Sequence, residues 1–206
     1  MTKAYEQSNN FLMTEYCQKR LKRPDPVKLF MGLIISPHIE PEDLKKKLED
    51  RFGPIDHQSP IHVFDHTDYY AGEMGPDLKR CFCSFINLVQ PEDLSSIKGI
   101  TNRMEIEMGK PRRGVICRLV NMDPGILSLS NIILATTKSR AHRIYLSDGI
   151  YAEVTLLYSK DKGWQPLDWT YPDYRTPLAM EFFHETRKGY YFQIKDRLRS
   201  SKFAES

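Results

Sequence analysis

The feature that most constrains the fold is a pattern that occurs twice. An apolar run is followed by Pro-Glu-Asp-Leu and then by an amphipathic segment. The first copy spans residues 27–35 and 41–44, and the second spans residues 81–89 and 91–94, 50 residues later. Each apolar run predicts a buried strand. Each Pro-Glu-Asp sequence is typical of a first helical turn, where proline fits and acidic side chains favour the positive end of the dipole.

The segments after both tetrapeptides have helical periodicity. Leu44, Leu48 and Phe52 recur every four residues, and Gly53 ends the first helix. The second helix has apolar residues at similar spacing and ends at Gly109. Two further strands are predicted at residues 61–67 and 115–122. The resulting order, β-α-β-β-α-β, is the split arrangement of ferredoxin-like domains.

The second half predicts a β-hairpin whose register follows from the apolar alternation. A three-residue loop, Ser147-Asp148-Gly149, places apolar residues opposite apolar residues. It also pairs Arg143 with Glu153 and Tyr145 with Tyr151, and puts His142 on the apolar side opposite Val154.

The chain ends in a predicted helix that Thr176 caps, with Pro177 in its first turn. We therefore predict an α+β protein with a ferredoxin-like β-α-β-β-α-β core, extended by a C-terminal β-hairpin and a terminal helix. Residues 1–25 form a polar arm, and residues 26–200 form a single domain.

Composition excludes several classes of protein. Of the 206 residues, 40% are hydrophobic and 28% are charged, which is typical of globular proteins. A net charge of +3 is too small to indicate a nucleic-acid binder. The four cysteines lack zinc or thioredoxin spacing, which favours reduced, buried thiols. No apolar run reaches the length of a membrane span, so we expect a cytoplasmic protein without membrane contact.

The sequence lacks the best-known phosphate-binding and metal-binding motifs. It contains neither Gly-x-x-x-x-Gly-Lys-Ser/Thr nor Gly-x-Gly-x-x-Gly, which argues against a P-loop GTPase or ATPase. His62 and His66 lie four residues apart on an expected strand, a separation of roughly 13 Å that is too long for chelation of one ion. We therefore assign no metal ligands, and no cofactor is indicated.

Unusual polar residues are concentrated between Asn121 and Arg175. Residues 121–125, Asn-Met-Asp-Pro-Gly, are typical of a turn at the end of a core strand. Residues 128–138 have two interpretations. A helix would place basic residues at its C-terminus, whereas an extended segment would let Lys138, Arg140 and Arg143 converge on an anion.

Several of these residues also have structural explanations. A histidine such as His142 is more often a hydrogen-bonded core residue than a base, and Arg143 with Glu153 can be a simple cross-strand pair. The aromatic residues of segment 164–175 either pack their loop onto the core or stack on a base or sugar ring.

These residues form motifs that resemble a bacterial and archaeal family catalogued as a domain of unknown function. The resemblance covers residues 27–190, and some members carry the label GTP-binding protein. The motifs that carry it are Thr67-Asp68-Tyr69-Tyr70, Glu73-Met74-Gly75-Pro76, Asn121-Met122-Asp123-Pro124-Gly125, Ala135-Thr136-Thr137-Lys138, His142-Arg143-Ile144-Tyr145-Leu146, residues 148–155 and residues 169–175.

The resemblance adds a set of residues rather than a mechanism. With the residue chemistry, it predicts a cleft that binds a nucleotide or another phosphate-bearing small molecule. Asp123 and His142 are the candidate acid/base residues. The candidate ligand-binding residues are Asp68, Lys138, Arg143, Glu153, Tyr171, Asp173, Tyr174 and Arg175.

The alternative hypothesis is a non-enzymatic RNA-binding or protein-interaction module on a ferredoxin-like sheet. The sequence alone decides neither whether the protein is an enzyme nor its oligomeric state.

Overall fold

The computed structural model describes residues 24–65, 67, 69–112 and 114–204. The expected polar arm lies almost entirely outside these residues. In chain order the elements are β1 Val27–Ile35, α2 Pro41–Phe52, β2 Ile55–Gln58, β3 His62–Val63, α3 Ala71–Met74, β4 Lys79–Val89, η1 Pro91–Asp93, α4 Leu94–Glu107, β5 Lys110–Arg112, β6 Val115–Cys117, β7 Val120–Leu127, β8 Asn131–Thr136, β9 Ile144–Ser147, β10 Ile150–Ser159, β11 Gly163–Pro166, η2 Pro172–Arg175 and α5 Pro177–Ala204.

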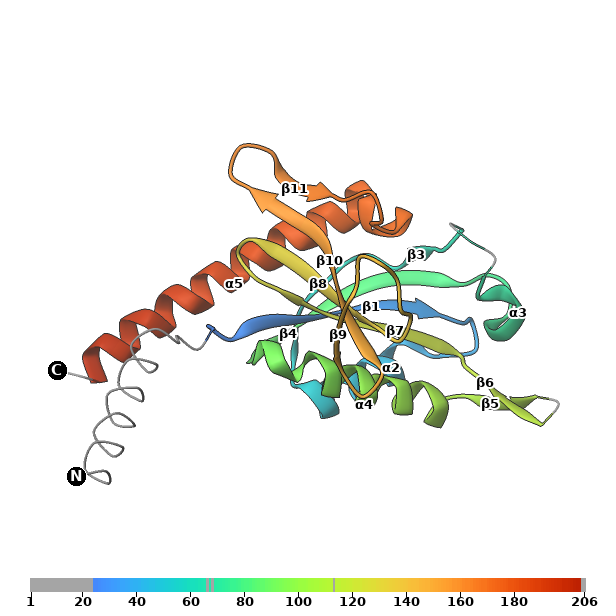
Figure 1. Ribbon diagram of the computed structural model, residues 1–206. Helices are drawn as coiled ribbons and strands as arrows, with labels where there is room; N and C mark the ends of the chain where they lie inside the picture. Colours follow the sequence, from blue (N-terminus) through green and yellow to red (C-terminus); the bar gives the residue numbers. More distant parts are fainter. Residues whose placement is uncertain (1–23, 66, 68, 113, 205–206) are drawn as a thin grey trace, which may run out of the picture.

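One large sheet organises the described part of the molecule (Figure 1). Its main path is β11-β10-β8-β7-β1-β4-β2, with β3 paired to β4 and β9 paired to β10. Every pair in this sheet is antiparallel. The small sheet of β5 and β6 is separate. This combination of helices and an antiparallel sheet confirms the predicted α+β class.

Helices cover both faces of the sheet (Figure 1), and each face has its own hydrophobic core. On one face, Phe30 and Phe82 pack with Phe182 and Phe183 of α5. On the other face, Leu44 and other apolar residues of α2 and α4 pack against strand residues. The central strand β1 contributes to both cores and is buried along its whole length, as its sequence predicts.

Both Pro-Glu-Asp-Leu sequences begin helices as predicted. Helix α2 starts at Pro41 and ends before Gly53, which adopts a φ of 94°. At the second copy, η1 leads directly into α4. The terminal helix is also confirmed, since Thr176 Oγ1 accepts a hydrogen bond from the Ala179 N–H at 3.2 Å.

The predicted strands at residues 61–67 and 115–122 are only partly correct. The first is reduced to the two residues of β3, and β2 was missed because Ile55 is its only apolar residue. The second is broken between β6 and β7 at Arg118 and Leu119. The Arg118 backbone N–H donates to Glu73 Oε1 at 3.1 Å, so a side chain replaces strand pairing at the break.

The predicted turn at residues 121–125 is wrong, because this segment lies inside β7. Asp123, Pro124 and Gly125 pair with Gly32, Met31 and Phe30 of β1. Gly125 is required for packing: a Cβ there would lie 2.3 Å from Phe30 Cζ and 2.9 Å from the Ile133 carbonyl oxygen. Residues 121–125 therefore have a composition typical of turns but form part of a tightly packed strand.

The helical interpretation of residues 128–138 is also wrong, since β8 occupies most of the segment. Its Ile132 and Leu134 belong to the core beneath α5, and Ala135 belongs to a neighbouring cluster. The extended conformation carries the chain past β7 and towards Lys138.

The hairpin of β9 and β10 has the predicted register but a different turn. Asp148 and Gly149 form a two-residue turn with φ values of 49° and 75°. A register shift between Ile150 and Tyr151 then restores the expected pairing of Tyr151 with Tyr145. The three-residue loop is therefore wrong. His142 lies in a turn before β9, and Val154 pairs with Ile133 of β8, so the expected opposition of His142 and Val154 is also wrong.

Two glycine substitutions should have opposite effects on stability. We expect Gly125→Ala to lower the free energy of unfolding by about 1–3 kcal/mol, because its Cβ would collide with the Phe30 ring. Gly189→Ala in α5 should raise it by up to about 1 kcal/mol, because no described atom beyond the adjacent backbone of α5 and the neighbouring residues lies within 4 Å of the added Cβ, and alanine favours helix. Urea unfolding of both variants measures these changes. Equal stability of the two variants would contradict the packing role of Gly125.

Candidate functional site

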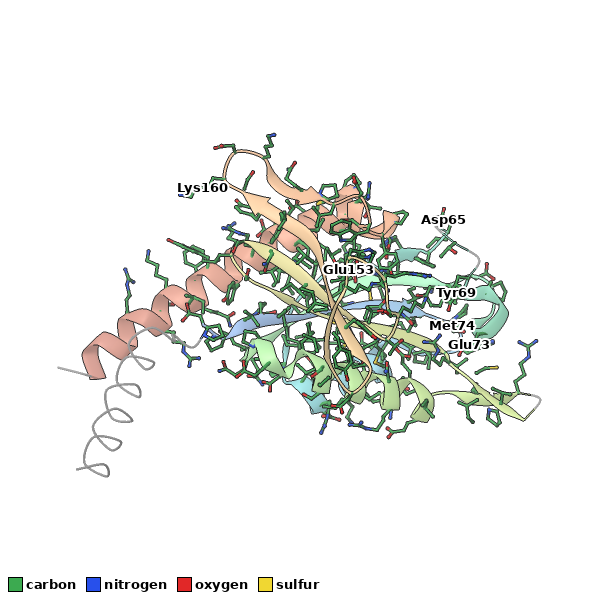
Figure 2. All side chains as sticks on the ribbon, in the orientation of Figure 1. Asp65, Tyr69, Glu73, Met74, Glu153 and Lys160 are labelled. Carbon is green, nitrogen blue, oxygen red and sulfur yellow. The ribbon has the colours of Figure 1, made fainter. Side chains whose placement is uncertain are left out.

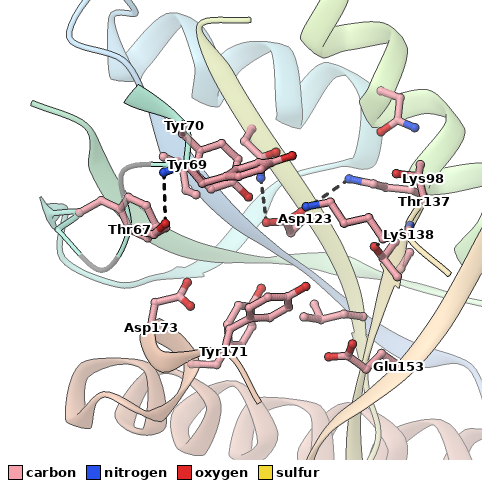
Figure 3. Close-up of a pocket in the computed structure, with 18 of the residues that line it drawn as sticks. Thr67, Tyr69, Tyr70, Lys98, Asp123, Thr137, Lys138, Glu153, Tyr171 and Asp173 are labelled. Carbon is pink, nitrogen blue, oxygen red and sulfur yellow. Dashed lines mark hydrogen bonds and ion pairs between the residues drawn. The ribbon is translucent and has the colours of Figure 1, made fainter. Parts of the chain in front are cut away.

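A cavity of about 550 Å³ lies beside the first half of β7 (Figure 3). Most of its lining comes from the segment before α3, helix α4, the strands β7 and β8 with the residues that follow β8, and η2 with the residue before it. Ile34 of β1, Arg118, Arg143 and Glu153 of β10 complete the lining. Figure 3 shows Asp123 and Lys138 on one side of this space, and Asp173 and Tyr171 on the other.

The cavity opens where β7 and β8 stop pairing. Their last pair is Gly125 with Leu134, and the preceding residue of β7 is Pro124. Proline has no backbone N–H and is tolerated only where the strand edge is unpaired. The chain beyond Leu134 therefore separates from β7, and the space between them becomes the cavity.

Side chains of helix α4 bind the backbone groups at the edge of β7, where a neighbouring strand would otherwise pair. Glu105 Oε1 accepts the Met122 backbone N–H at 2.6 Å, and Lys98 Nζ donates to the Met122 carbonyl at 2.7 Å. Lys98 and Glu105 are both buried, with 6% and 3% of their surfaces exposed. Burial removes water from the Glu105 carboxylate and raises its pKa. These two buried side chains thus supply the hydrogen bonds that a neighbouring strand would make to Met122.

The carboxylate of Asp123 lies on the cavity wall next to this edge. Its Oδ1 lies 3.6 Å from Lys98 Nζ, and its Oδ2 accepts a hydrogen bond from Asn121 Nδ2 at 2.8 Å. About 30% of the Asp123 side chain is exposed. Asp123 therefore combines a fixed orientation with access to the cavity.

Arg118 joins α3 and α4 on the same side of the cavity. Its Nε and Nη2 donate to the two carboxylate oxygens of Glu73 at 2.9 and 2.8 Å. Its Nη1 donates to Glu105 at 2.9 Å and to Asn121 at 3.0 Å. These hydrogen bonds lower the pKa of Glu73. The charge of Arg118 is thus neutralised by protein carboxylates.

Glu153 lines the cavity from β10, and only 1% of its surface is exposed. Its Oε2 lies 2.7 Å from Arg143 Nε and 3.0 Å from His142 Nε2. Arg143 also donates to the Lys138 carbonyl and the Tyr171 hydroxyl, both at 2.8 Å. In contrast, Oε1 of Glu153 has no hydrogen-bond partner among the described residues. The predicted contact of Arg143 with Glu153 is present as an ion pair, but it is not a cross-strand pair, because Arg143 precedes β9 and Glu153 pairs with Leu134 of β8.

Lys138 extends over the cavity from the end of the β8 segment (Figure 3). Its Nζ lies 4.4 Å from the centre of the Tyr69 ring, a cation–π contact. In the part of the chain that the structure describes, no carboxylate forms an ion pair with it. Among the described cations that line the cavity, Lys138 is therefore the one without a carboxylate partner.

A buried charged group contacts two of the residues that line the cavity, Asp173 and Tyr174. Arg80 is fully buried and forms an ion pair with Asp173 at 2.8 Å. Gly32 makes room for it, because a Cβ there would lie 2.7 Å from Arg80 Nη2 and 2.6 Å from the Tyr174 hydroxyl. Burial raises the pKa of Tyr174 well above its usual value, which keeps the hydroxyl protonated.

Seven of the ten residues predicted from the sequence line this cavity. They are Asp123, Lys138, Arg143, Glu153, Tyr171, Asp173 and Tyr174. His142 lies behind Glu153 and stacks on Trp169 at 4.9 Å. Arg175 instead donates to the carbonyls of Leu167, Asp168 and Thr170, so it holds its own loop. Asp68 lies outside the described residues, as does His66.

Sequence reasoning missed two charged residues that line the cavity, Lys98 and Arg118, and two that contact lining residues, Arg80 and Glu105. A signal for two of them was present in α4. Leu94, Lys98, Thr101 and Glu105 follow a spacing of four, three and four, which places all of them on one helical face, and all four are buried. A charged residue at such a position indicates a buried polar partner.

Two further properties of the described residues bear on function. No group of three or more His, Cys, Asp or Glu side chains within residues 24–65, 67, 69–112 and 114–204 is arranged to hold a metal ion. None of the helices in those ranges is long and apolar enough to cross a membrane.

The Glu73–Arg118 pair predicts a pH-dependent contribution to stability. The pKa of Glu73 is lowered by Arg118, so the pair stabilises the fold above the ordinary glutamate pKa, and this contribution is lost as pH falls through the folded pKa. We expect Glu73→Gln to lower the free energy of unfolding by about 0.5–1 kcal/mol at pH 7. The difference from the native chain should shrink below about pH 4.

Urea unfolding between pH 3 and pH 7 measures this difference, with Glu107→Gln as the matched control on the exposed side of α4. A deficit for Glu73→Gln that stays constant over the whole range would contradict the assigned ion pair.

Comparison with known proteins assigns the chain to a family. A model for a domain of unknown function, DUF4416, matches residues 25–190. No curated protein and no solved structure matches the chain. The matched region contains β1 to β11 and all the described residues that line the cavity. The chain therefore belongs to the DUF4416 family of domains of unknown function.

Proposed function

We propose that the protein binds a small phosphate-bearing molecule, such as a nucleotide, in the cavity beside β7. The observation that carries this proposal is the position of Lys138 on the cavity wall, without a carboxylate partner among the described residues. The cavity volume of about 550 Å³ is in the range of small-molecule sites. An anion bound at Lys138 would balance its charge.

The pairing of the other charged residues on the cavity wall also favours an anion site at Lys138. Arg143 is paired with Glu153, and Lys98 lies near Asp123. Arg118 is held by two glutamates. Because these cations already have carboxylate partners, a bound anion gains most at Lys138.

Hydroxyl groups that line the cavity add hydrogen-bond donors for an anion. Thr67, Thr136 and Thr137 all line the cavity. Lysine recognises phosphate as a point charge, and neutral donors complete the coordination of the remaining oxygens. This arrangement does not require the backbone cradle of a P-loop, which the sequence lacks.

Exposed aromatic side chains border the cavity and suit a ring-containing ligand. Tyr69 is 65% exposed and Tyr171 is 41% exposed. Tyrosines in this position can stack on a base or pack against a sugar. Tyr174, which is only 2% exposed, is better suited to hydrogen bonding through its hydroxyl than to stacking.

If the protein is an enzyme, Asp123 is the stronger candidate for proton transfer, because its carboxylate is oriented by two neighbours and reaches the cavity. His142 would act through Glu153, since it does not line the cavity itself. We further infer a ferredoxin-like core, which the strand order β7-β1-β4-β2 and the positions of α2 and α4 support.

The alternative, an RNA-binding or protein-interaction module on the sheet, has less support. Helix α5 packs on one face of the sheet, and α2 and α4 pack on the other. RNA-binding sheets of this kind stack bases on exposed aromatic side chains. The aromatic residues of β1 and β4, Phe30, Phe82 and Phe85, are instead fully buried.

A thermal-shift screen against nucleotides and phosphorylated metabolites tests the proposal. A ligand that binds the folded state raises Tm with concentration by mass action. We expect Lys138→Gln to weaken that response by about 10-fold to 100-fold, the range for loss of a charged hydrogen bond. Because Lys138 is exposed, the variant should keep its fold.

The matched control is Lys160→Gln, at an exposed lysine in the turn after β10 and away from the cavity (Figure 2). Its response should equal that of the native chain. The proposal fails if no phosphate-bearing compound shifts Tm, or if Lys138→Gln and Lys160→Gln respond alike.

A further inference from the structure

The second recognition group of the cavity is the carboxylate of Glu153. Its two oxygens have different surroundings: Oε2 contacts Arg143 and His142, whereas Oε1 has no hydrogen-bond partner in the described chain. A buried carboxylate oxygen without a donor is costly, so such an atom indicates a partner that binds there. Figure 3 shows the carboxylate at the cavity, on the side of Tyr171.

The orientation of this carboxylate is fixed from behind. Arg143 Nε binds Oε2 at 2.7 Å, and the same guanidinium is held by the Lys138 carbonyl and the Tyr171 hydroxyl. His142 stacks on Trp169, which holds its ring beside Oε2. Glu153 therefore has little freedom to turn its free oxygen towards another protein group.

We propose that Oε1 of Glu153 accepts a hydrogen bond from a hydroxyl or amino group of the bound molecule. This inference rests on the proposed function, in which Lys138 binds the phosphate. Together, the two contacts assign the ligand to the class of phosphate esters that carry a hydroxyl or an amine. Arg143 contacts both Glu153 and the backbone of Lys138, so it links the two recognition groups, which both line the cavity. A single compact ligand can reach both.

A substitution at Glu153 can reverse the hydrogen-bonding character of the oxygen that has no partner among the described residues. In Glu153→Gln the amide oxygen must face Arg143, because Arg143 Nε is always a donor. The amide NH₂ then occupies the place of Oε1. An acceptor is thereby replaced by a donor, with nearly the same size and shape.

Three probes distinguish an acceptor from a donor at this position in calorimetric titrations: ethyl phosphate, phosphoethanolamine and glycerol 3-phosphate. Ethyl phosphate offers no donor beyond its phosphate, an ammonium only donates, and a hydroxyl both donates and accepts. The native protein should bind phosphoethanolamine and glycerol 3-phosphate about 10-fold more tightly than ethyl phosphate, the gain expected for one hydrogen bond to a charged group.

In Glu153→Gln the advantage of phosphoethanolamine should disappear, while glycerol 3-phosphate should keep most of its advantage because its hydroxyl can accept. Because the substitution removes the carboxylate partner of Arg143, the affinity for the phosphate of all three probes should rise together, so the test is the ratio of the three affinities within each protein. The matched control is Glu181→Gln, at an exposed position of α5, which should behave like the native chain. Lys138→Gln should weaken all three probes by the same factor.

The outcomes separate this inference from the proposed function. If ethyl phosphate binds through Lys138 but the amine and the hydroxyl add nothing in the native protein, the role of Glu153 is overturned and phosphate binding stands. The same holds if phosphoethanolamine keeps its advantage in Glu153→Gln. If none of the probes binds, both proposals are overturned. The comparison of probes on the native protein remains decisive even if Glu153→Gln does not fold.

Discussion

The unpaired edge of β7 at Met122 is the constraint on which the site depends. A buried backbone N–H and C=O need partners, and here no strand supplies them. Glu105 and Lys98 of α4 bind the two groups instead, and Pro124 removes the next donor from the same edge. Because these three residues replace a neighbouring strand, β8 can diverge after Leu134. The divergence creates a cavity lined by polar groups inside an otherwise continuous sheet.

The elements that the sequence predicted well are those specified by local chemistry. Strand β1 is apolar throughout, and both Pro-Glu-Asp-Leu sequences begin helices because proline and acidic residues suit a first turn in any context. The errors arose where tertiary pairing decided the outcome. Residues 121–125 have the composition of a turn, but their pairing with β1 keeps them extended. The short strand β2 has too few apolar residues to be recognised before its pairing with β4 is known.

The candidate site follows the same division. Family motifs and residue chemistry selected Asp123, Lys138 and Glu153, all of which line one cavity. Arg175 was selected for its charge, but its Nε and Nη2 groups donate to backbone carbonyls of its own loop, which no sequence pattern indicates. Arg80 was overlooked because one arginine in an apolar strand gives no hint of the room that Gly32 leaves for it.

The use of a helix to complete a strand edge restricts how α4 can vary in length. Lys98 and Glu105 are seven residues apart, which is close to two helical turns, and both reach the same residue of β7. An insertion or deletion of one residue between them would rotate one side chain by about 100° relative to the other. One of the two backbone groups of Met122 would then lose its partner. Length changes should therefore be confined to the loops around α4, while its central two turns keep a fixed number of residues.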